Sequence, residues 1–413
     1  MNQLPNGWKQ INLKNIIDGS IKNGFSPVAA SHETGYWVLS LGALTDDGIQ
    51  VSEIKPVLPE SKILENILSM NDFLVSRSNT PSKVGRSIRF QNEINNCAYP
   101  DLMMRFRINS EKADVAYIEQ FLRSSFVRSY FTNSAAGSSK TMVKINKRIL
   151  ENTLIYLPEN INEQTKIAQI LTTWDNAIRT IEQLIQNSEQ QKQALMQQLL
   201  TGKKRLFDEN GERFCGVWET KKLSTLIQEI NKEKEIFPDV IELLTVKLHH
   251  KGAVRSGKFP KTTEKGRPYY KRYAGELIIG RQNLHNGGVA IVPDECNGLI
   301  ASSAISSFNA KGDNTDLEFI LSVMSTEYFK FMVNNLTGGT GQKEVSVSQL
   351  MSISIPVPPF KEQQKIAAVL TAADNEIDTL KQTLCRLKTE KQALMQQLLT
   401  GKRRVFVALS EQE

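Results

Sequence analysis

The sequence contains the segment Lys-Gln-Ala-Leu-Met-Gln-Gln-Leu-Leu-Thr-Gly-Lys twice, at residues 192–203 and at residues 391–402. Each copy is preceded by a segment of the form Glu-Gln-x-Lys-Ile-Ala, at residues 163–168 and 362–367. The copies are offset by 199 residues without insertion, and 26 of 45 aligned positions are identical. A repeat of this length and identity indicates a tandem duplication of the chain.

Each copy is predicted to form one long helix. Apolar residues recur at alternating steps of three and four, the spacing of a coiled-coil seam. About 38 residues at 1.5 Å per residue would give a rod of roughly 57 Å. The alternative is a pair of core helices in an ordinary bundle, but bundle helices are usually much shorter. The predicted seam residues are Ile167, Leu171, Trp174, Ile178, Ile181, Ile185, Leu195, Leu199, Ile366, Leu370, Ile377, Leu380, Leu384, Leu387, Leu394 and Leu398.

Polar residues interrupt this seam, and glycines mark its ends. Ser188 and Lys192 break the first copy, and Lys391 breaks the second. Such polar layers can fix the register of a coiled coil at some cost in stability. Gly202 and Gly401 stand where a helix commonly ends in a left-handed residue.

Composition places the chain among basic globular proteins. It has 413 residues, a net charge of +7 and a pI near 9.0, which favours a polyanionic partner. Its apolar runs are too short to span a membrane, and its first residues lack a signal-peptide pattern. The four cysteines are isolated in the sequence, which argues against zinc or disulfides. The chain is therefore expected in the cytoplasm.

The helices divide the chain into four predicted segments. Residues 1–158 and 208–358 are globular units of mixed α and β structure, whereas residues 159–207 and 359–413 are the helices with the tail. The two globular units share faint sequence echoes. A globular unit precedes each helix, so a pseudo-two-fold axis would make the helices antiparallel. The expected fold is α/β (mixed α+β), with two domains separated by an antiparallel coiled coil.

Two basic stretches are candidates for DNA contact. Residues 77–89 contain four basic residues and no acid, and residues 247–272 contain nine basic residues and one acid. Lysines can neutralise phosphates, whereas arginine and asparagine can read base edges. A solvated loop, or a turn held by Arg-x-Asn hydrogen bonds, is the structural alternative. The predicted contacts are Arg77, Asn79, Lys83, Arg86, Lys258, Lys261, Arg267, Tyr269, Lys271, Arg281 and Asn283.

The sequence contains no catalytic motif above background. No glycine-rich run precedes Lys-Ser or Lys-Thr as a phosphate-binding loop requires, and residues 338–341 lack its strand–turn–helix setting. No target-base motif of an amino methyltransferase is present. His249 and His250 are adjacent and would diverge on a strand instead of chelating one metal. We therefore predict no catalytic residues, no metal site and no bound cofactor.

The paired helical motifs, together with the Pro-x-Gly-Trp segment at residues 5–8, resemble the DNA-specificity subunits of type I restriction–modification systems. The resemblance implies that the globular units are target-recognition domains, each reading half of a bipartite, asymmetric site in double-stranded DNA. It also implies that the helices set the spacing and dock two methyltransferase subunits. Adenine-N6 methylation, S-adenosylmethionine, ATP and magnesium would belong to partner subunits, including any motor-nuclease subunits.

Two other functions are consistent with parts of the sequence. A single-chain methyltransferase–nuclease would need the cofactor and target-base motifs that these residues lack. A coiled-coil scaffold could instead use its basic domains to bind RNA or acidic proteins. Neither alternative explains the repeated helical motifs as well as a specificity subunit does.

Overall fold

The structure is a computed structural model that describes residues 4–46, 48–139, 141–230, 234–260, 268–336 and 344–406. The chain divides into two compact units. Unit 1 contains Met1–Glu182 and Gln382–Glu413, and unit 2 contains Gln183–Lys381. Each unit therefore combines one globular domain with half of each long helix.

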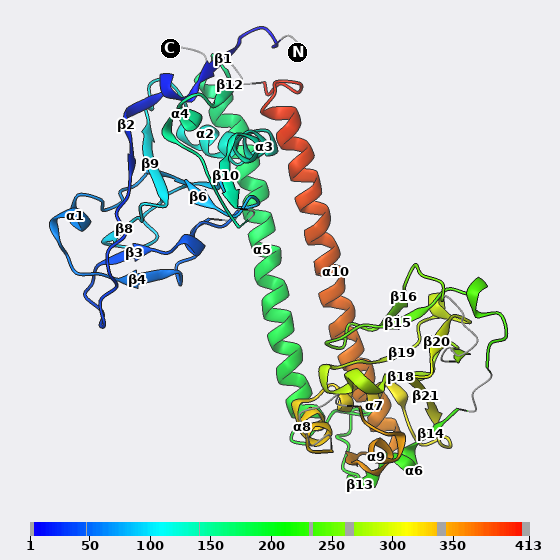
Figure 1. Cartoon of the computed structure of the whole chain (residues 1–413). Coiled ribbons are helices and arrows are strands. Elements are labelled where there is room, and N and C mark those ends of the chain that lie inside the picture. The colour runs from blue at the N-terminus through cyan, green and yellow to red at the C-terminus, as the bar shows by residue number, and fades with distance from the viewer. Residues whose placement is uncertain are drawn as a thin grey trace. The chain divides into compact units, whose positions relative to one another are not determined.

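The unit 1 domain contains a four-stranded antiparallel sheet. Its strand order is β2 (Ile17–Asn23), β9 (Met103–Ile108), β5 (Phe73–Ser76) and β7 (Ser87–Arg89). The strand β5 is buried on both faces, and β2 and β9 lie side by side in Figure 1. Alternate residues of β5 point to opposite faces, so Phe73 packs into one core cluster and Leu74 into another. Beside this sheet lies the strand β3 (Trp37–Leu39), which belongs to a separate three-stranded sheet.

Short elements surround this sheet. The terminal strands β1 (Trp8–Asn12) and β12 (Leu154–Pro158) pair with each other. The remaining strands, together with β3, form two three-stranded sheets. The helices lie in the connections between strands. These elements are β4 (Ile54–Pro56), β6 (Ser78–Asn79), β8 (Cys97–Ala98), β10 (Ala136–Ser139), β11 (Met142–Lys144), α1 (Ser61–Leu64), α2 (Val115–Leu122), α3 (Ser125–Ser134) and α4 (Lys147–Glu151), with 3-10 helices η1 (Leu13–Asn15) and η2 (Leu41–Ala43).

Residues 115–134 form two helices, α2 and α3, with a break between them. Asp114 caps the first, because its side chain accepts a hydrogen bond from the amide of Tyr117. Ser124 caps the second by accepting from the amide of Val127. A serine at this position satisfies the amides of a new helix start, so the chain breaks between α2 and α3.

Unit 2 repeats the arrangement of unit 1. Its central sheet has the order β14-β21-β18-β19, its terminal strands β13 and β22 pair, and α7, α8 and α9 follow as α2, α3 and α4 do. The elements are β13 (Glu219–Lys222), α6 (Leu223–Leu226), β14 (Ile227–Glu229), η3 (Pro238–Val240), β15 (Leu244–Val246), β16 (Ala253–Arg255), β17 (Tyr269–Lys271), β18 (Leu277–Gly280), η4 (Arg281–Asn286), β19 (Val289–Ile291), η5 (Asp294–Cys296), β20 (Ile300–Ser302), β21 (Ile305–Ala310), α7 (Leu317–Met324), α8 (Glu327–Leu336), α9 (Val347–Ser352) and β22 (Ser354–Val357).

The two long helices are α5 (Ile161–Leu199) and α10 (Phe360–Leu398). In unit 1, Asp175 of α5 pairs with Lys391 of α10, and Glu182 pairs with Lys388. In unit 2, Glu189 pairs with Lys381 and Lys192 with Asp374. The partner number falls as the α5 number rises, so the helices run antiparallel within each unit. The predicted helix pair and fold class are confirmed.

The predicted seam is shielded from solvent, but part of it serves the globular cores. Eight seam residues are buried and the other eight are half-buried. The buried ends join the domains: Ile167, Leu171 and Leu398 belong to the core of unit 1, and Leu199, Ile366 and Leu370 to that of unit 2. The seam residues in the middle of each helix therefore pack against the other long helix, whereas those near the ends also pack into a globular core. Among the described residues, no helix is apolar over a bilayer-spanning length.

Candidate nucleic-acid interface

The start of each long helix is clamped by an arginine that follows the end of the other helix. Arg404 donates two hydrogen bonds to Glu163, from Nε to Oε1 (2.8 Å) and from Nη2 to Oε2 (2.9 Å). Arg205 makes the same two bonds to Glu362, at 2.6 and 2.7 Å. The hydrogen bonds that the two arginines donate to these glutamates raise the pKa of both arginines. Bidentate pairing of this kind fixes orientation as well as distance.

The glutamine next to each glutamate attaches the helix to its globular domain. Gln164 donates to the carbonyl of Pro158 (2.7 Å) and accepts from the amide of Asp114 (2.9 Å). Gln363 donates to Pro358 (2.9 Å) and accepts from Asp316 (3.0 Å) in the same way. The repeated Glu-Gln pair thus holds helix and domain together. The sequence alone did not reveal these roles. The presence of the same Glu-Gln pair in both copies was the signal that could have indicated them.

The sequence left open whether residues 203–205 and 402–404 contact DNA or complement helix ends. Arg205 and Arg404 are engaged by glutamates within the protein. Lys203 and Lys402 are exposed. The arginines Arg205 and Arg404 therefore hold the helix junctions together.

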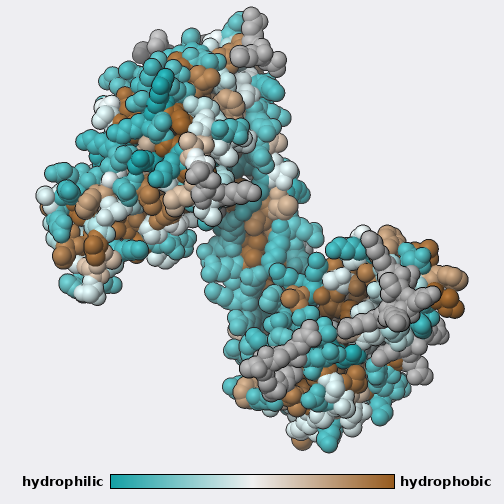
Figure 2. All heavy atoms as spheres, viewed as in Figure 1, coloured by the Kyte–Doolittle hydropathy of each residue, from teal (hydrophilic) through white to brown (hydrophobic). Residues whose placement is uncertain are grey.

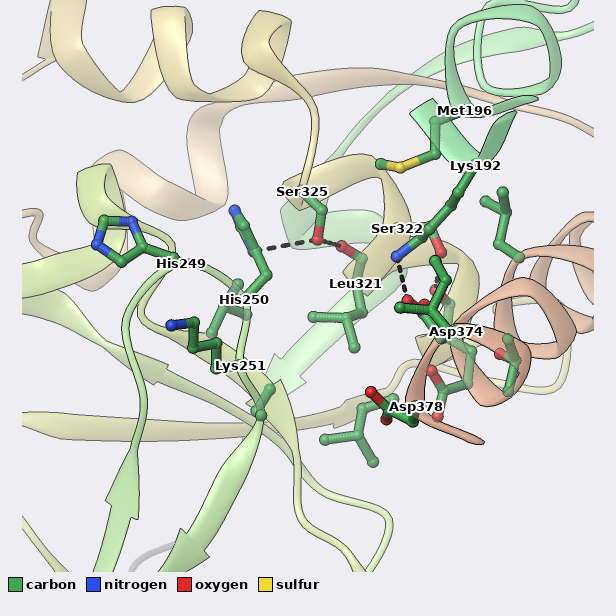
Figure 3. A pocket seen from close by; sticks show the side chains of 18 of the residues that line it. Lys192, Met196, His249, His250, Lys251, Leu321, Ser322, Ser325, Asp374 and Asp378 are labelled. Atoms are coloured by element: carbon green, nitrogen blue, oxygen red, sulfur yellow. Dashed lines mark hydrogen bonds and ion pairs between the residues drawn. The ribbon is translucent and has the colours of Figure 1, made fainter. Parts of the chain in front are cut away.

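The lysines that interrupt the predicted seam pair with aspartates of the opposite helix. Lys391 donates to Asp175 (2.6 Å), which also accepts from Gln120 of α2 (2.8 Å). Lys192 pairs with Asp374 at the equivalent position of unit 2 (Figure 3). The Lys391–Asp175 pair is half-buried, whereas in the Lys192–Asp374 pair the aspartate is exposed. A shift of register would separate these charges, so the pairs favour one alignment of the helices.

The predicted contact residues of unit 1 lie on or beside a loop that α3 holds in place. Arg128 donates to the carbonyls of Val84 (3.0 Å) and Ser82 (2.8 Å). Gly85 has a φ of 72°, and an added Cβ would lie 2.5 Å from the ring of Phe131. The loop is therefore tightly packed on α3, and a larger residue at Gly85 would displace it.

The four predicted residues on this loop differ in exposure. Lys83 is exposed, whereas the half-buried Arg77 donates only a long hydrogen bond to the carbonyl of Asp101 (3.4 Å). Arg86 pairs with Asp46. Asn79 is only 6% exposed and bonds to Ser76 and to the amide of Thr80. Asn79 thus takes the structural role that the sequence left open as an alternative.

The predicted contact residues of unit 2 are less closely grouped. Lys258 and Asn283 are exposed, and Tyr269 is half-buried in β17. Lys271 pairs with Glu235 (3.0 Å). Lys261 and Arg267 lie outside the described residues.

Arg281 is held at the end of β18 by two partners. Its Nε donates to Glu344 (3.1 Å) and its Nη1 to the hydroxyl of Ser306 (3.0 Å). Its counterpart Arg77 has no such carboxylate partner among the described residues. The two Arg-x-Asn motifs therefore match in sequence but differ in their contacts.

A polar cleft lies in unit 2 between the domain and its halves of the long helices (Figure 3). His249 and His250 lie in the turn between β15 and β16, at φ values of 59° and 54°. The His250 ring is within hydrogen-bonding distance of the Ser325 hydroxyl (3.1 Å). Burial, followed by the charge of Lys192, lowers the pKa of His250. No group of three metal-binding side chains occurs among the described residues, so the histidines form no evident metal site.

The two units share one arrangement of domain and helices. Two domains of one topology each enclose the ends of a shared antiparallel helix pair, and each domain presents basic residues at its surface. The chemistry that this arrangement supports is recognition of an extended polyanion at two places. The helices act as a structural link between the readers.

Comparison with known proteins identifies the family. The chain matches the family described as type I restriction modification DNA specificity domain over residues 5–190 and again over residues 217–389. The chain belongs to this family and is a specificity subunit, the non-catalytic DNA-recognition component of a restriction–modification system. The predicted family and non-enzymatic role are thereby confirmed.

Individual relatives agree with this assignment. A putative type I restriction enzyme specificity subunit (MjaX) of Methanocaldococcus jannaschii is 25% identical over 98% of this chain and 95% of its own length. The specificity subunit MjaVIII of the same organism is 28% identical over 63% of this chain and 64% of its own. The fold resembles the crystal structure of the S subunit from M. genitalium, with a TM-score of 0.60 and 13% identity over 96% of this chain and 98% of that one.

Proposed function

We propose that each globular domain reads one half of a bipartite, asymmetric site in double-stranded DNA, while α5 and α10 set the separation of the two halves. The attachment of each domain to the helices carries this proposal. Gln164 and Gln363 fix the domains by matching hydrogen bonds, and the arginine clamps fix the helix junctions. A reader held rigidly on a spacer can measure distance along DNA, whereas one on a flexible linker cannot.

We further propose that the repeated helix ends dock two copies of a methyltransferase subunit. Exposed residues usually diverge after duplication, and residues 184–191 share no identity with residues 383–390. By contrast, Gln193, Ala194 and Gln197 are exposed in both copies and unchanged. The same surface retained twice fits one kind of partner present in two copies. Adenine-N6 methylation, its S-adenosylmethionine and any ATP- and magnesium-dependent cleavage would then belong to the partner subunits.

The DNA contacts are assigned to the exposed basic side chains of each domain. Lys83 and Lys258 are exposed and suit phosphates. Arg77 and Arg281, at the ends of equivalent strands, suit base edges, because a guanidinium can bond two acceptors of guanine. Of the eleven residues predicted to contact DNA, we therefore propose as contacts the ones whose polar atoms are accessible.

Replacing Arg281 with alanine tests this assignment. We expect specific binding to fall by about 10- to 100-fold, the cost of one good arginine–base contact. Mutating the half-site read by unit 2 should cause no further loss in the variant, whereas mutating the other half-site should. Binding of the chain with its methyltransferase partner is measured on duplexes in which either half-site is scrambled.

Two matched variants separate base reading from other effects. Glu344→Gln keeps the arginine but weakens its ion pair, so it should retain specific binding. Lys83→Ala should weaken binding to specific and random duplexes alike and reduce the salt dependence by about one phosphate contact. Equal loss on specific and random duplexes for Arg281→Ala would rule out base reading by that residue.

A further inference from the structure

The two long helices carry opposite charges at two equivalent positions. Position 182 of α5 corresponds to 381 of α10, and 189 corresponds to 388, by the 199-residue offset. These positions hold Glu182 and Glu189 in α5 but Lys381 and Lys388 in α10. The duplication has therefore kept the apolar seam while reversing its flanking charges.

Each of these residues is paired across the helices. Lys388 Nζ lies 2.6 Å from Glu182 Oε1 in unit 1, and Lys381 Nζ lies 2.7 Å from Glu189 Oε1 in unit 2. All four side chains are about a third to a half exposed, at 33–51%. They border the seam on helices whose outer surface is mostly hydrophilic (Figure 2). Flanking charges of this kind commonly select the partner of a coiled-coil helix.

The polar layers inside the seam cannot make this selection. Asp175 and Lys192 of α5 correspond to Asp374 and Lys391 of α10, with the same charge in both copies. In an antiparallel pair of two α5 helices, Asp175 of one copy would still meet Lys192 of the other. These layers and the apolar seam thus fit a like helix as well as an unlike one.

The outer charges do distinguish the two pairings. The residue of α5 equivalent to Lys388 is Glu189, so pairing two α5 helices would place Glu182 against Glu189. Pairing two α10 helices would likewise place Lys381 against Lys388. We propose that these four residues make α5 and α10 selective for each other and exclude association of either helix with its own counterpart in a second copy of the chain. A specificity subunit would thereby keep two different readers on one helix pair.

Exchanging one residue between the helices tests the proposal in the full chain. The double substitution Glu189→Lys with Lys388→Glu leaves the net charge unchanged. It creates Glu–Glu and Lys–Lys contacts between α5 and α10, but Glu–Lys contacts between like helices. We expect self-association about tenfold tighter than in the control below. The reason is that both contacts between α5 and α10 become repulsive, while both contacts between like helices become attractive. Analytical ultracentrifugation at low salt measures this self-association.

The matched control is Glu182→Lys with Lys388→Glu, which also keeps the net charge. It reverses one ion pair but leaves α5 attractive to α10 at both positions, so its Tm should respond to salt as that of the wild type does. It also replaces the like-charge contacts between like helices by opposite-charge contacts, so its self-association should lie between that of the wild type and that of the exchanged variant. Salt should lower the Tm of wild type and control but raise that of the exchanged variant. An exchanged variant that folds only at about 0.5 M salt would support the proposal, because salt screens exposed charges. Equal association and equal salt response in the two variants would overturn it.

Discussion

Asp175 and Asp374 occupy equivalent positions in the two long helices, but their surroundings differ. The Asp175 side chain is 15% exposed, and it contacts Lys391, Gln120 and Arg123. The Asp374 side chain is 52% exposed and pairs with Lys192. Burial by itself would raise the pKa of Asp175, but Arg123 and the hydrogen bond from Lys391 lower it below its usual value.

We expect Asp175→Asn to destabilise unit 1 by about 1–3 kcal/mol at neutral pH, since it leaves Lys391 and Arg123 without their shared carboxylate. A carboxyl whose pKa is lowered by folding stabilises the protein above its unfolded pKa, about 3.9, and loses that contribution as pH falls further. The difference between wild type and variant should therefore shrink below about pH 4. Denaturant unfolding across pH measures this.

Asp374→Asn is the matched comparison for this variant. Exposed ion pairs contribute about 0–1 kcal/mol, so the loss should be small. A loss as large as that of Asp175→Asn, or one independent of pH for Asp175→Asn, would contradict the role given to burial. The two copies carry identical residues at these positions, but only their neighbours in the fold decide how much each pair contributes to stability.

At the scale of elements, the sequence predicted the parts that depend on local periodicity. The long helices and the duplicated arrangement of a globular unit followed by a helix both follow from spacing and repetition. The pattern could not show that the outer seam residues pack into globular cores. Apolar spacing records which face of a helix is buried, but not which element covers it.

The candidate site was less predictable for the same reason. Composition singled out two basic stretches as candidates for DNA contact, and Lys83 and Lys258 are exposed in them. The sequence could not show that Asn79 is buried or that Arg281 is held by Glu344, because those contacts come from distant parts of the chain. Hydrogen-bonding residues have several partners to choose from, and only the fold selects one.

Gly401 and Gly202 allow a direct test of how the helix ends dock. Both have left-handed backbones, with φ values of 71° and 69°. An added Cβ at Gly401 would lie 2.5 Å from Cγ of Pro5, whereas at Gly202 the nearest atom, in Trp218, is 3.5 Å away. The proline ring has little freedom to move aside, so the Gly401 junction should be the less tolerant one.

We expect Gly202→Ala to cost about 1 kcal/mol, the usual penalty for a left-handed alanine. Gly401→Ala should cost at least about 1–3 kcal/mol more, because the methyl group overpacks the contact with Pro5. Thermal unfolding of the two variants measures the difference. Equal costs would show that the segment around Pro5 yields to the methyl group without loss of stability.

At the scale of the whole molecule, residues from the beginning and from the end of the sequence pack together in the core of unit 1. Leu398 and Leu399 are 2% and 3% exposed, and they share the core that contains Trp8. Arg404 also donates to the carbonyl of Asn6 (2.8 Å). Among the residues that the structure describes, the buried core of unit 2 includes none beyond Leu370. The last turn of α10 therefore supports the first domain and not the second.

Ending the chain after Lys391 should consequently unfold the first domain selectively. Each buried leucine lost costs about 2–5 kcal/mol, so removing Leu398 and Leu399 would consume most of a typical domain's stability of about 5–15 kcal/mol. Hydrogen exchange should lose protection over residues 8–158 and keep it over residues 219–357, while a chain ending at Phe406 should match the wild type. Protection lost equally in both domains would mean that the far end of α10 stabilises the chain as a whole, and the assignment of each helix end to one domain would be wrong.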